Sequence, residues 1–245
     1  MGNSINHDLV KEINEIRNQF SYSKRIGFLF GAGTSKAVGI SDIATLTNKI
    51  DTDLKITKSE FDKLKLHDDK KSKNIEEILN QVRLIRQITD DKDSKNFDGI
   101  TGANAKKLDL EICNLIYEII SKEEMTANLD PVKKFLTWLN WLSRDFTKEI
   151  FTTNYDLLIE KGFEGLQIPY YDGFVGAHEP FFLPESLDRE SKYDAPPNAW
   201  IRLWKIHGSL GWFWKQNDSN GSYRIVRLGV EAKKINPDNE LVIYP

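Results

Sequence analysis

The segment from Arg25 to Ser41, RIGFLFGAGTSKAVGIS, constrains the fold more than any other part of the sequence. A short apolar run ends in Gly31, Ala32 and Gly33, and the residues after these glycines favour a helix. A strand, a glycine turn and a helix N-terminus can together hold a phosphate, because free N–H groups and the helix dipole attract negative charge and glycine lets a ligand approach the backbone. The spacing is not that of the G-x-G-x-x-G dinucleotide motif, and the lysine of a P-loop is missing. A tight turn without a ligand therefore stays open as the alternative.

Two later segments end in the same manner as this first one. EIFTTNYD, from Glu149 to Asp156, and LWKIHGSL, from Leu203 to Leu210, are β-prone runs that end in polar residues. Polar residues of this kind gather at the carboxyl ends of parallel strands, where an open α/β sheet binds its ligand. We therefore expect Gly33, Asn154 and His207 to surround one crevice of a parallel sheet.

Taken in order, the three segments resemble the signature of the sirtuin superfamily. GAGTSKAVGISD is similar to the GAG-x-S-x-x-x-GI-x-D turn of that family, without a gap from Gly31 to Asp42. TTNYD resembles its T-Q-N-x-D segment, and KIHGS resembles its HG pair. The resemblance implies an α/β fold with a Rossmann-like parallel sheet flanked by helices, and it implies that the chain binds NAD+.

Departures from the family pattern narrow this resemblance. Ile43 and Ala44 stand where protein-deacylating sirtuins have Phe and Arg, and Thr153 and Tyr155 stand where they have Gln and Ile. Cys113 is the single cysteine, so the chain cannot form a zinc ribbon with two CxxC pairs. The chain resembles instead the divergent, zinc-free sirtuin-like domains of bacterial antiphage-defence proteins, which hydrolyse NAD+ to nicotinamide and ADP-ribose.

The resemblance also implies roles for individual residues. Asn154 would orient the ribose and the attacking water, and His207 would bond the ribose hydroxyls and act as a general base; these two are the expected catalytic residues. Asp156 would contact the carboxamide of nicotinamide, and Asp42 would shape the pocket around it. The phosphate-cradling turn and the residue before Asn154 complete the expected cofactor-binding set: Gly31, Ala32, Gly33, Thr34, Ser35 and Thr153.

Each of these roles has a simpler alternative. Asn154 and Asp156 precede LLIEKGF and could cap a helix there, and Ser35 could cap a helix without touching a ligand. His207 could be a core histidine bonded to the backbone. Three functions follow from these readings: an NAD+ glycohydrolase, which we favour, a non-catalytic nucleotide-binding or assembly module, and an NAD-dependent protein deacylase. The missing Phe-Arg pair and zinc ribbon argue against the deacylase.

Composition and charge argue against several other classes of protein. A formal net charge of −3 and a pI near 5.9 give no electrostatic footprint for nucleic acid. No stretch approaches the ~20 apolar residues of a membrane span, and one cysteine rules out an internal disulfide framework, so we expect a cytoplasmic protein. The resemblance adds an expected homo-oligomer and a partner ATPase or nuclease. We expect no structural zinc, because the histidines are widely scattered: His7, His67, His178 and His207.

Hydrophobic periodicity divides the chain into a core and an insertion. The pattern predicts helices over 5–20, 35–50, 75–88, 108–120 and 130–144, and strands over 25–30, 149–153, 201–206, 210–216, 222–228 and 241–244. Residues 54–73 are heavily charged and predict a surface connection or an exposed helix face. We expect an inserted helical module over 55–128 within a Rossmann-like core of residues 1–54 and 129–245. The final ELVIYP resembles a strand cut off at its exit, so this single domain, 1–245, is expected to be incomplete at its C-terminus.

Overall fold

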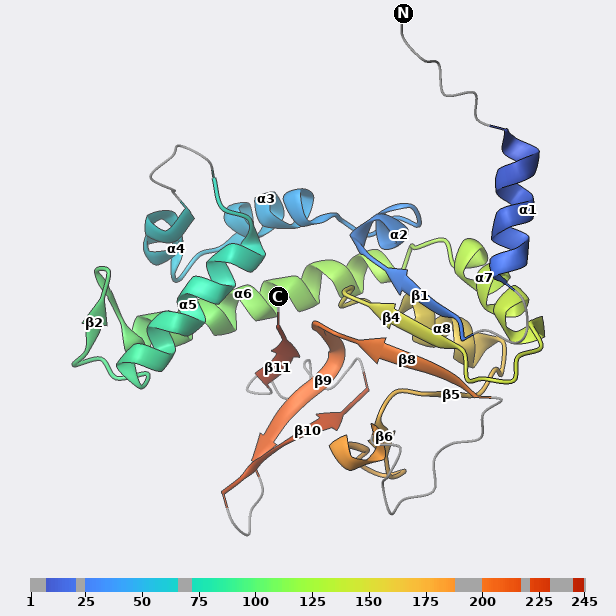
Figure 1. Ribbon diagram of the computed structural model, residues 1–245. Coiled ribbons are helices and arrows are strands. Elements are labelled where there is room, and N and C mark those ends of the chain that lie inside the picture. Colours follow the sequence, from blue (N-terminus) through green and yellow to red (C-terminus); the bar gives the residue numbers. More distant parts are fainter. Residues whose placement is uncertain are drawn as a thin grey trace, which may run out of the picture.

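Figure 1 shows the computed structural model, which describes residues 8–20, 25–65, 72–187, 200–216, 221–229 and 240–244. Within these residues, the central sheet has four parallel strands in the order β1-β4-β8-β5. They are β1 (Gly27–Phe30), β4 (Glu149–Thr152), β8 (Ile201–Lys205) and β5 (Tyr170–Tyr171). Helices flank this sheet (Figure 1), so the predicted α/β fold with a parallel sheet is confirmed.

The strands alternate in burial because helices cover one face of the sheet. Ile150 of β4 and Leu203 of β8 are direct neighbours in the register, and both are almost completely buried. They form one apolar cluster with side chains from α7 (Asp130–Trp141) and α8 (Leu158–Gly165). Each of these helices adjoins β4 in the sequence, so a short connection places it on the strand that it covers.

Lys148 ties the end of α7 to the start of β4. Its ammonium lies 3.0 Å from the carbonyl oxygen of Leu139 and 3.1 Å from that of Leu142. The last carbonyls of a helix lack partners within the helix, and a cation there also opposes the negative end of the helix dipole. The predicted helix over 130–144 is confirmed over 130–141, with Pro131 in its first turn.

A long run of helices separates β1 from β4. It comprises α2 (Ala32–Lys36), α3 (Ile43–Asp53), α4 (Lys58–Lys65), α5 (Ile75–Thr89), α6 (Gly102–Glu124) and α7, with a small hairpin of β2 (Asn96–Phe97) and β3 (Ile100–Thr101) before α6. The predicted continuous helix over 35–50 is wrong. Gly39, between α2 and α3, has φ +110°, a conformation that glycine adopts without the steric cost of a side chain and that interrupts a helix.

The short helix α4 corrects the prediction for residues 54–73. Phe61 and Leu64 are fully buried there, so this charged stretch contributes to the core as well as to the surface. The two apolar residues lie three positions apart, on one face of the helix, and that spacing was the signal that the charges obscured. Residues 66–71, which include His67, lie outside the described residues.

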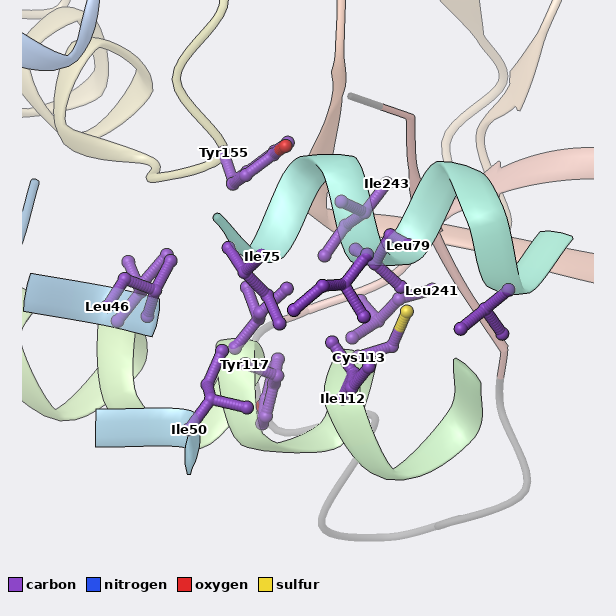
Figure 2. Close-up of a cluster of buried hydrophobic side chains, with 14 of the residues drawn as sticks. Leu46, Ile50, Ile75, Leu79, Ile112, Cys113, Tyr117, Tyr155, Leu241 and Ile243 are labelled. Atoms are coloured by element: carbon purple, nitrogen blue, oxygen red, sulfur yellow. The ribbon is translucent and has the colours of Figure 1, made fainter. Parts of the chain in front are cut away.

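The main hydrophobic core lies between α5, α6 and a second sheet (Figure 2). Ile75 and Leu79 of α5 pack with Ile112 of α6, and Leu241 and Ile243 of the last strand belong to the same cluster. The helices that follow β1 in the sequence therefore rest on strands from the end of the chain.

This second sheet is antiparallel. Its order is β11-β9-β10-β7-β6, formed by β6 (Phe174–Val175), β7 (Phe181–Phe182), β9 (Gly208–Gln216), β10 (Tyr223–Arg227) and β11 (Glu240–Ile243), and a 3₁₀ helix over Pro184–Leu187 follows β7. The predicted strands over 210–216, 222–228 and 241–244 are confirmed to within two residues at each end. Their periodicity did not indicate that they leave the parallel sheet and pair with one another.

The first helix, α1 (Leu9–Gln19), stands beside α7 in Figure 1 and buries none of its residues. Asp8 caps it, because its Oδ1 accepts from the amides of Val10 at 3.1 Å and Lys11 at 3.2 Å. The predicted helix over 5–20 is confirmed over 9–19, and residues 1–7 lie outside the described part. Among the described residues, no helix is long and apolar enough to cross a membrane.

Replacing Gly208 by alanine should destabilise the fold strongly. Gly208 has φ +85°, and a Cβ there would lie 1.9 Å from the carbonyl oxygen of Val242 in the neighbouring strand β11. We expect Gly208→Ala to lower the free energy of unfolding by at least ~2 kcal/mol, measured by urea denaturation. Gly211→Ala is the matched control, because its Cβ would meet no atom closer than 3.7 Å. Equal unfolding midpoints for the two variants would contradict the close approach of β9 and β11.

Candidate functional site

Three strands end at the same edge of the parallel sheet. The register pairs the last residues of neighbouring strands: Phe30 with Thr152, and Thr152 with Lys205. Gly31 follows β1 directly. Asn154 follows β4, and His207 follows β8, each after one intervening residue. Since the strands are parallel, all three residues leave the sheet at this one edge, where ligands of open α/β sheets bind.

Asn154 holds the turn after β1 against the end of β4. Its Nδ2 lies 2.7 Å from Oγ of Ser35, 3.0 Å from the carbonyl oxygen of Gly31 and 3.2 Å from Oγ1 of Thr34. The Ser35 hydroxyl donates in turn to Oδ2 of Asp156 at 2.6 Å, and both of these residues are buried. Ser35 and Asp156 are 121 positions apart in the sequence, so this cluster forms only when the chain folds.

Helix capping explains only part of this cluster. Oδ1 of Asp156 accepts from the amide of Leu158, the first residue of α8, at 3.2 Å, so Asp156 binds the start of that helix from the position before its N-cap residue, Leu157. Ser35 lies within α2 and uses its hydroxyl for Asp156. The amide of Asn154 faces the turn after β1 rather than α8. Capping therefore leaves the positions of Ser35 and Asn154 unexplained.

A cavity of about 250 Å³ opens beside this cluster. Its polar wall is formed by Thr34, Ser35, Asn154 and Asp156. Its remaining wall is apolar and comes mainly from β1, α7 and α8: Phe30, Ala37, Val38, Pro131, Val132, Phe135, Leu136, Leu158 and Ile159. A mostly apolar cavity with a few convergent polar groups is typical of a small-molecule binding site.

Gly31 and Gly33 leave open space in front of the turn. Gly31 has an ordinary extended backbone with φ −108°, and Gly33 lies inside α2 without a positive φ. A Cβ added at either position would meet no atom within 4 Å. Neither backbone conformation nor packing therefore requires glycine here. The neighbouring residues Ala32 and Thr34 are exposed, so this turn is accessible from solvent.

Asp42 and Thr153 lie outside the hydrogen-bonded cluster. Asp42 caps α3, because its Oδ1 accepts from the amide of Thr45 at 2.9 Å, and its Oδ2 pairs with Lys36. The bond from Lys36, followed by those from Thr45, holds the pKa of Asp42 well below its usual range, so this carboxylate is ionised at neutral pH. Thr153 contributes its backbone amide, which donates to the carbonyl oxygen of Phe30 at 3.2 Å. Neither residue lines the cavity.

His207 stands at the end of β8 and is half-buried. Its Nδ1 is buried and has no hydrogen-bond partner within the described part of the chain. The bond from this nitrogen to the backbone that a core histidine can form is therefore absent among the described residues. The His207 carbonyl oxygen accepts from the amide of Tyr244 at 2.8 Å. His207 does not line the cavity beside Asn154, and the pairing of β4 with β8 is what brings the two residues to one edge.

A buried ion pair that was not predicted from the sequence lies beneath the site. Lys205 is almost fully buried; its ammonium donates to the carbonyl oxygen of Asp156 and lies 3.0 Å from Oε1 of Glu160. Burial raises the pKa of Glu160, although the charge of Lys205 opposes this shift. The available signal was alternation: Ile201, Leu203 and Lys205 share the buried face of β8, so a lysine occupies a core position of the strand.

The only cysteine has no features of a nucleophile or of a metal ligand. Burial raises the pKa of the Cys113 thiol to about 12, so the sulfur stays protonated at neutral pH. Within the described residues, no group of three or more His, Cys, Asp and Glu side chains could hold a metal ion. His7 and His67 lie outside the described residues.

Comparison with protein families finds a match in the second half of the chain. Residues 148–226 match the model of the SIR2-like domain, and domains of this kind bind NAD+. The matched segment includes Asn154, Asp156 and His207. The glycine turn from Gly31 to Asp42 lies outside the matched segment. Hydrogen bonds of Ser35 with Asn154 and Asp156 nevertheless join this turn to the matched segment. Comparison with curated proteins gives no match.

Removing the positive charge of Lys205 should destabilise the fold in a pH-dependent way. Lys205→Met leaves Glu160 buried without its counter-ion, a change that typically costs ~3–5 kcal/mol. A carboxyl group whose pKa is higher in the folded than in the unfolded state stabilises the fold less as the pH rises through that interval. Unfolding measurements should therefore show a larger deficit at pH 8 than at pH 5.

The double variant Lys205→Met/Glu160→Gln is the control for this experiment. It removes both charges, so it should recover much of the lost stability and show a weaker pH dependence than the single variant. A deficit that is the same at both pH values, with no recovery in the double variant, would contradict the role given to this ion pair.

Proposed function

We propose that this chain is an NAD+ glycohydrolase, which cleaves the bond between nicotinamide and ribose. The observation that carries the proposal is the cluster of Ser35, Asn154 and Asp156, which closes one wall of a cavity at the ligand-binding edge of the sheet. The match of residues 148–226 to the SIR2-like domain supports NAD+ as the molecule bound there. The open space in front of Gly31 and Gly33 fits a ligand whose phosphates approach the backbone.

Cleavage of the nicotinamide–ribose bond does not require a strong general acid. Water adds to C1′ of the ribose while the C1′–N bond breaks, and the bonding pair goes to the pyridinium nitrogen, so nicotinamide leaves as a neutral molecule. The attacking water loses one proton, and the products are nicotinamide, ADP-ribose and H+. Positive charge builds up on the ribose in the transition state, so the site must hold the ribose, confine the leaving group and place a water.

Asn154 is suited to placing the ribose and the water. Its amide hydrogens are directed to Gly31 and Ser35, which fixes the plane of the side chain. We assign its Oδ1 to a ribose hydroxyl or to the attacking water, because an acceptor held in place loses little freedom when the substrate binds.

The carboxylate of Asp156 is held by Ser35 on one oxygen and by the amide of Leu158 on the other. Carboxylate oxygens have further lone pairs, so Asp156 can also accept from the carboxamide of nicotinamide. The apolar wall from Val132 to Leu136 would then face the ring of the leaving group. This arrangement would confine nicotinamide beside the polar wall of the cavity.

His207 supplies the group that takes up a proton. Imidazole is a common general base, and the unpartnered Nδ1 of His207 is a buried polar atom that calls for a ligand. We assign this ring to the ribose hydroxyls and to the proton of the attacking water. From the resemblance to antiphage-defence domains we also propose that the activity depletes NAD+ in the cytoplasm, in a homo-oligomer that acts with an ATPase or a nuclease.

Substituting either proposed catalytic residue should abolish most turnover without unfolding the protein. We expect Asn154→Ala and His207→Ala each to lower the rate of nicotinamide release at least ~100-fold, the lower range for a positioned acid–base group. The melting temperature should change little in His207→Ala, whereas Asn154→Ala also loses the bonds to Gly31 and Ser35 and should be less stable but still folded. The assay follows nicotinamide release from NAD+ by the whole chain. The matched controls are Asn140→Ala and His178→Ala, which change exposed residues of the same types. Full turnover in both folded site variants would leave the non-catalytic binding module as the better description.

Alanine at Gly33 should weaken NAD+ binding while the fold stays intact. The new Cβ meets no protein atom within 4 Å and lies within a helix, so we expect the melting temperature to stay the same or to rise. The same Cβ would occupy space that the phosphates need, so calorimetry should show NAD+ affinity falling at least ~10-fold.

Gly99→Ala provides the opposite control. Gly99 has φ +73° in the β2–β3 turn, far along the chain from the site, so alanine there should lower stability and leave NAD+ affinity unchanged. Unchanged affinity in folded Gly33→Ala would show that the turn does not approach the phosphates.

A further inference from the structure

Two adjacent glutamates at the end of α6 each hold one of the loops that carry the candidate site. Glu123 binds the loop after α2: its Oε2 accepts from the amide of Ser41 at 2.8 Å and its Oε1 accepts from the hydroxyl of the same residue. Lys49 of α3 lies 2.6 Å from the Oε1 of Glu123. The loop after α2 is therefore attached to the C-terminal end of α6.

Glu124 binds the loop after β4. Its side chain is completely buried, its Oε1 accepts from the amide of Leu157 at 2.6 Å, and its Oε2 pairs with Lys161 of α8. Leu157 directly follows Asp156, which belongs to the hydrogen-bonded cluster of the site. A buried carboxylate with a charged partner and a backbone partner is a stiff attachment, because breaking either contact leaves a buried polar group unpaired.

Two further contacts join the same parts of the molecule. The amide of Asn128, just beyond α6, donates to the carbonyl oxygen of Val38 at 3.0 Å. The hydroxyl of Tyr155, which lies between Asn154 and Asp156, is 3.2 Å from Oε1 of Glu76 in the first turn of α5. Figure 2 shows Tyr155 at the edge of the core formed by α5 and α6.

We propose that Glu123 and Glu124 are positioning residues, which hold the two loops of the candidate NAD+ site at a fixed separation from the end of α6. Residues 37–42 and 153–157 belong to no helix or strand, so their position relative to the sheet is not fixed by regular secondary structure. The distance from Ser35 to Asn154 and Asp156 thus also depends on contacts outside the site. Lys205 holds the carbonyl of Asp156 from beneath the site, and the two glutamates hold Ser41 and Leu157 from the end of α6. The catalytic consequence rests on the proposed function, whereas the attachment of the loops does not.

Glu124→Ala and Glu123→Ala test this proposal with two readouts. The first is hydrogen exchange without NAD+: peptides that cover 153–158 should exchange faster in Glu124→Ala, and those that cover 36–42 should exchange faster in Glu123→Ala, whereas β4 should keep its protection in both. The second is turnover: kcat for nicotinamide release should fall at least ~10-fold with a smaller change in KM, because misplaced groups stabilise the transition state poorly.

Two companion variants separate positioning from general destabilisation. Glu118→Ala changes an exposed glutamate of the same helix and should leave exchange and turnover as in the wild type. Glu124→Gln keeps an oxygen that can accept from Leu157 but loses the charge toward Lys161, so it should fall between the wild type and Glu124→Ala in both readouts.

The outcomes keep this proposal apart from the proposed function. Unchanged local exchange in folded Glu123→Ala and Glu124→Ala would overturn the positioning role, whatever the activity. Faster local exchange in a protein whose wild type does not cleave NAD+ would support the attachment of the loops and reject the glycohydrolase. Faster exchange with full turnover would overturn the positioning role in catalysis.

Discussion

The parallel pairing of β1 with β4 is the contact on which the rest of the molecule depends. It joins Gly27 to Glu149 and Phe30 to Thr152, across the whole run of helices from α2 to α7. Once this ladder forms, the turn after β1 and the loop after β4 leave the sheet side by side, and Ser35 can reach Asn154 and Asp156. The cavity beside them exists because α7 and α8, the helices next to β4 in the sequence, cover the same face of the sheet.

Buried charged side chains hold this edge of the sheet. Lys205 bridges Asp156 and Glu160 under the site, and Glu124 joins Leu157 to Lys161 beside it. Such pairs contribute little net stability compared with apolar packing, but a buried charge tolerates few alternative arrangements, because each alternative would leave it unpaired. We attribute to these pairs a single geometry for the loop after β4, which suits the proposed function, in which the site places a water and a ribose.

Strand ends and helices were predictable from the sequence where local signals were strong. The apolar runs before Gly31, Asn154 and His207 predicted three strands, and the parallel register brings these residues to one edge of the sheet. The expected single crevice around Gly33, Asn154 and His207 stays a prediction, because neither Gly33 nor His207 lines the cavity beside Asn154. The helix over 35–50 was predicted wrongly because apolar periodicity continues across Gly39, whereas its positive φ depends on backbone geometry that periodicity does not report. The buried side of α4 was missed because lysines and aspartates outnumber Phe61 and Leu64 in that stretch.

By itself, the sequence determined the class of fold and the residue types available at the strand ends, because β-propensity, glycine and helical periodicity act over a few neighbouring residues. Only the tertiary structure decided which of those residues meet. It brought Ser35, Asn154 and Asp156 into one hydrogen-bonded cluster, and it made Asp42 the cap of α3. It also placed Lys205, Glu123 and Glu124 beside the loop residues that they hold, although no sequence motif indicates these contacts. These contacts join residues far apart in the chain. Their energies depend on burial and on short distances, and both arise only after the sheet and its helices have packed.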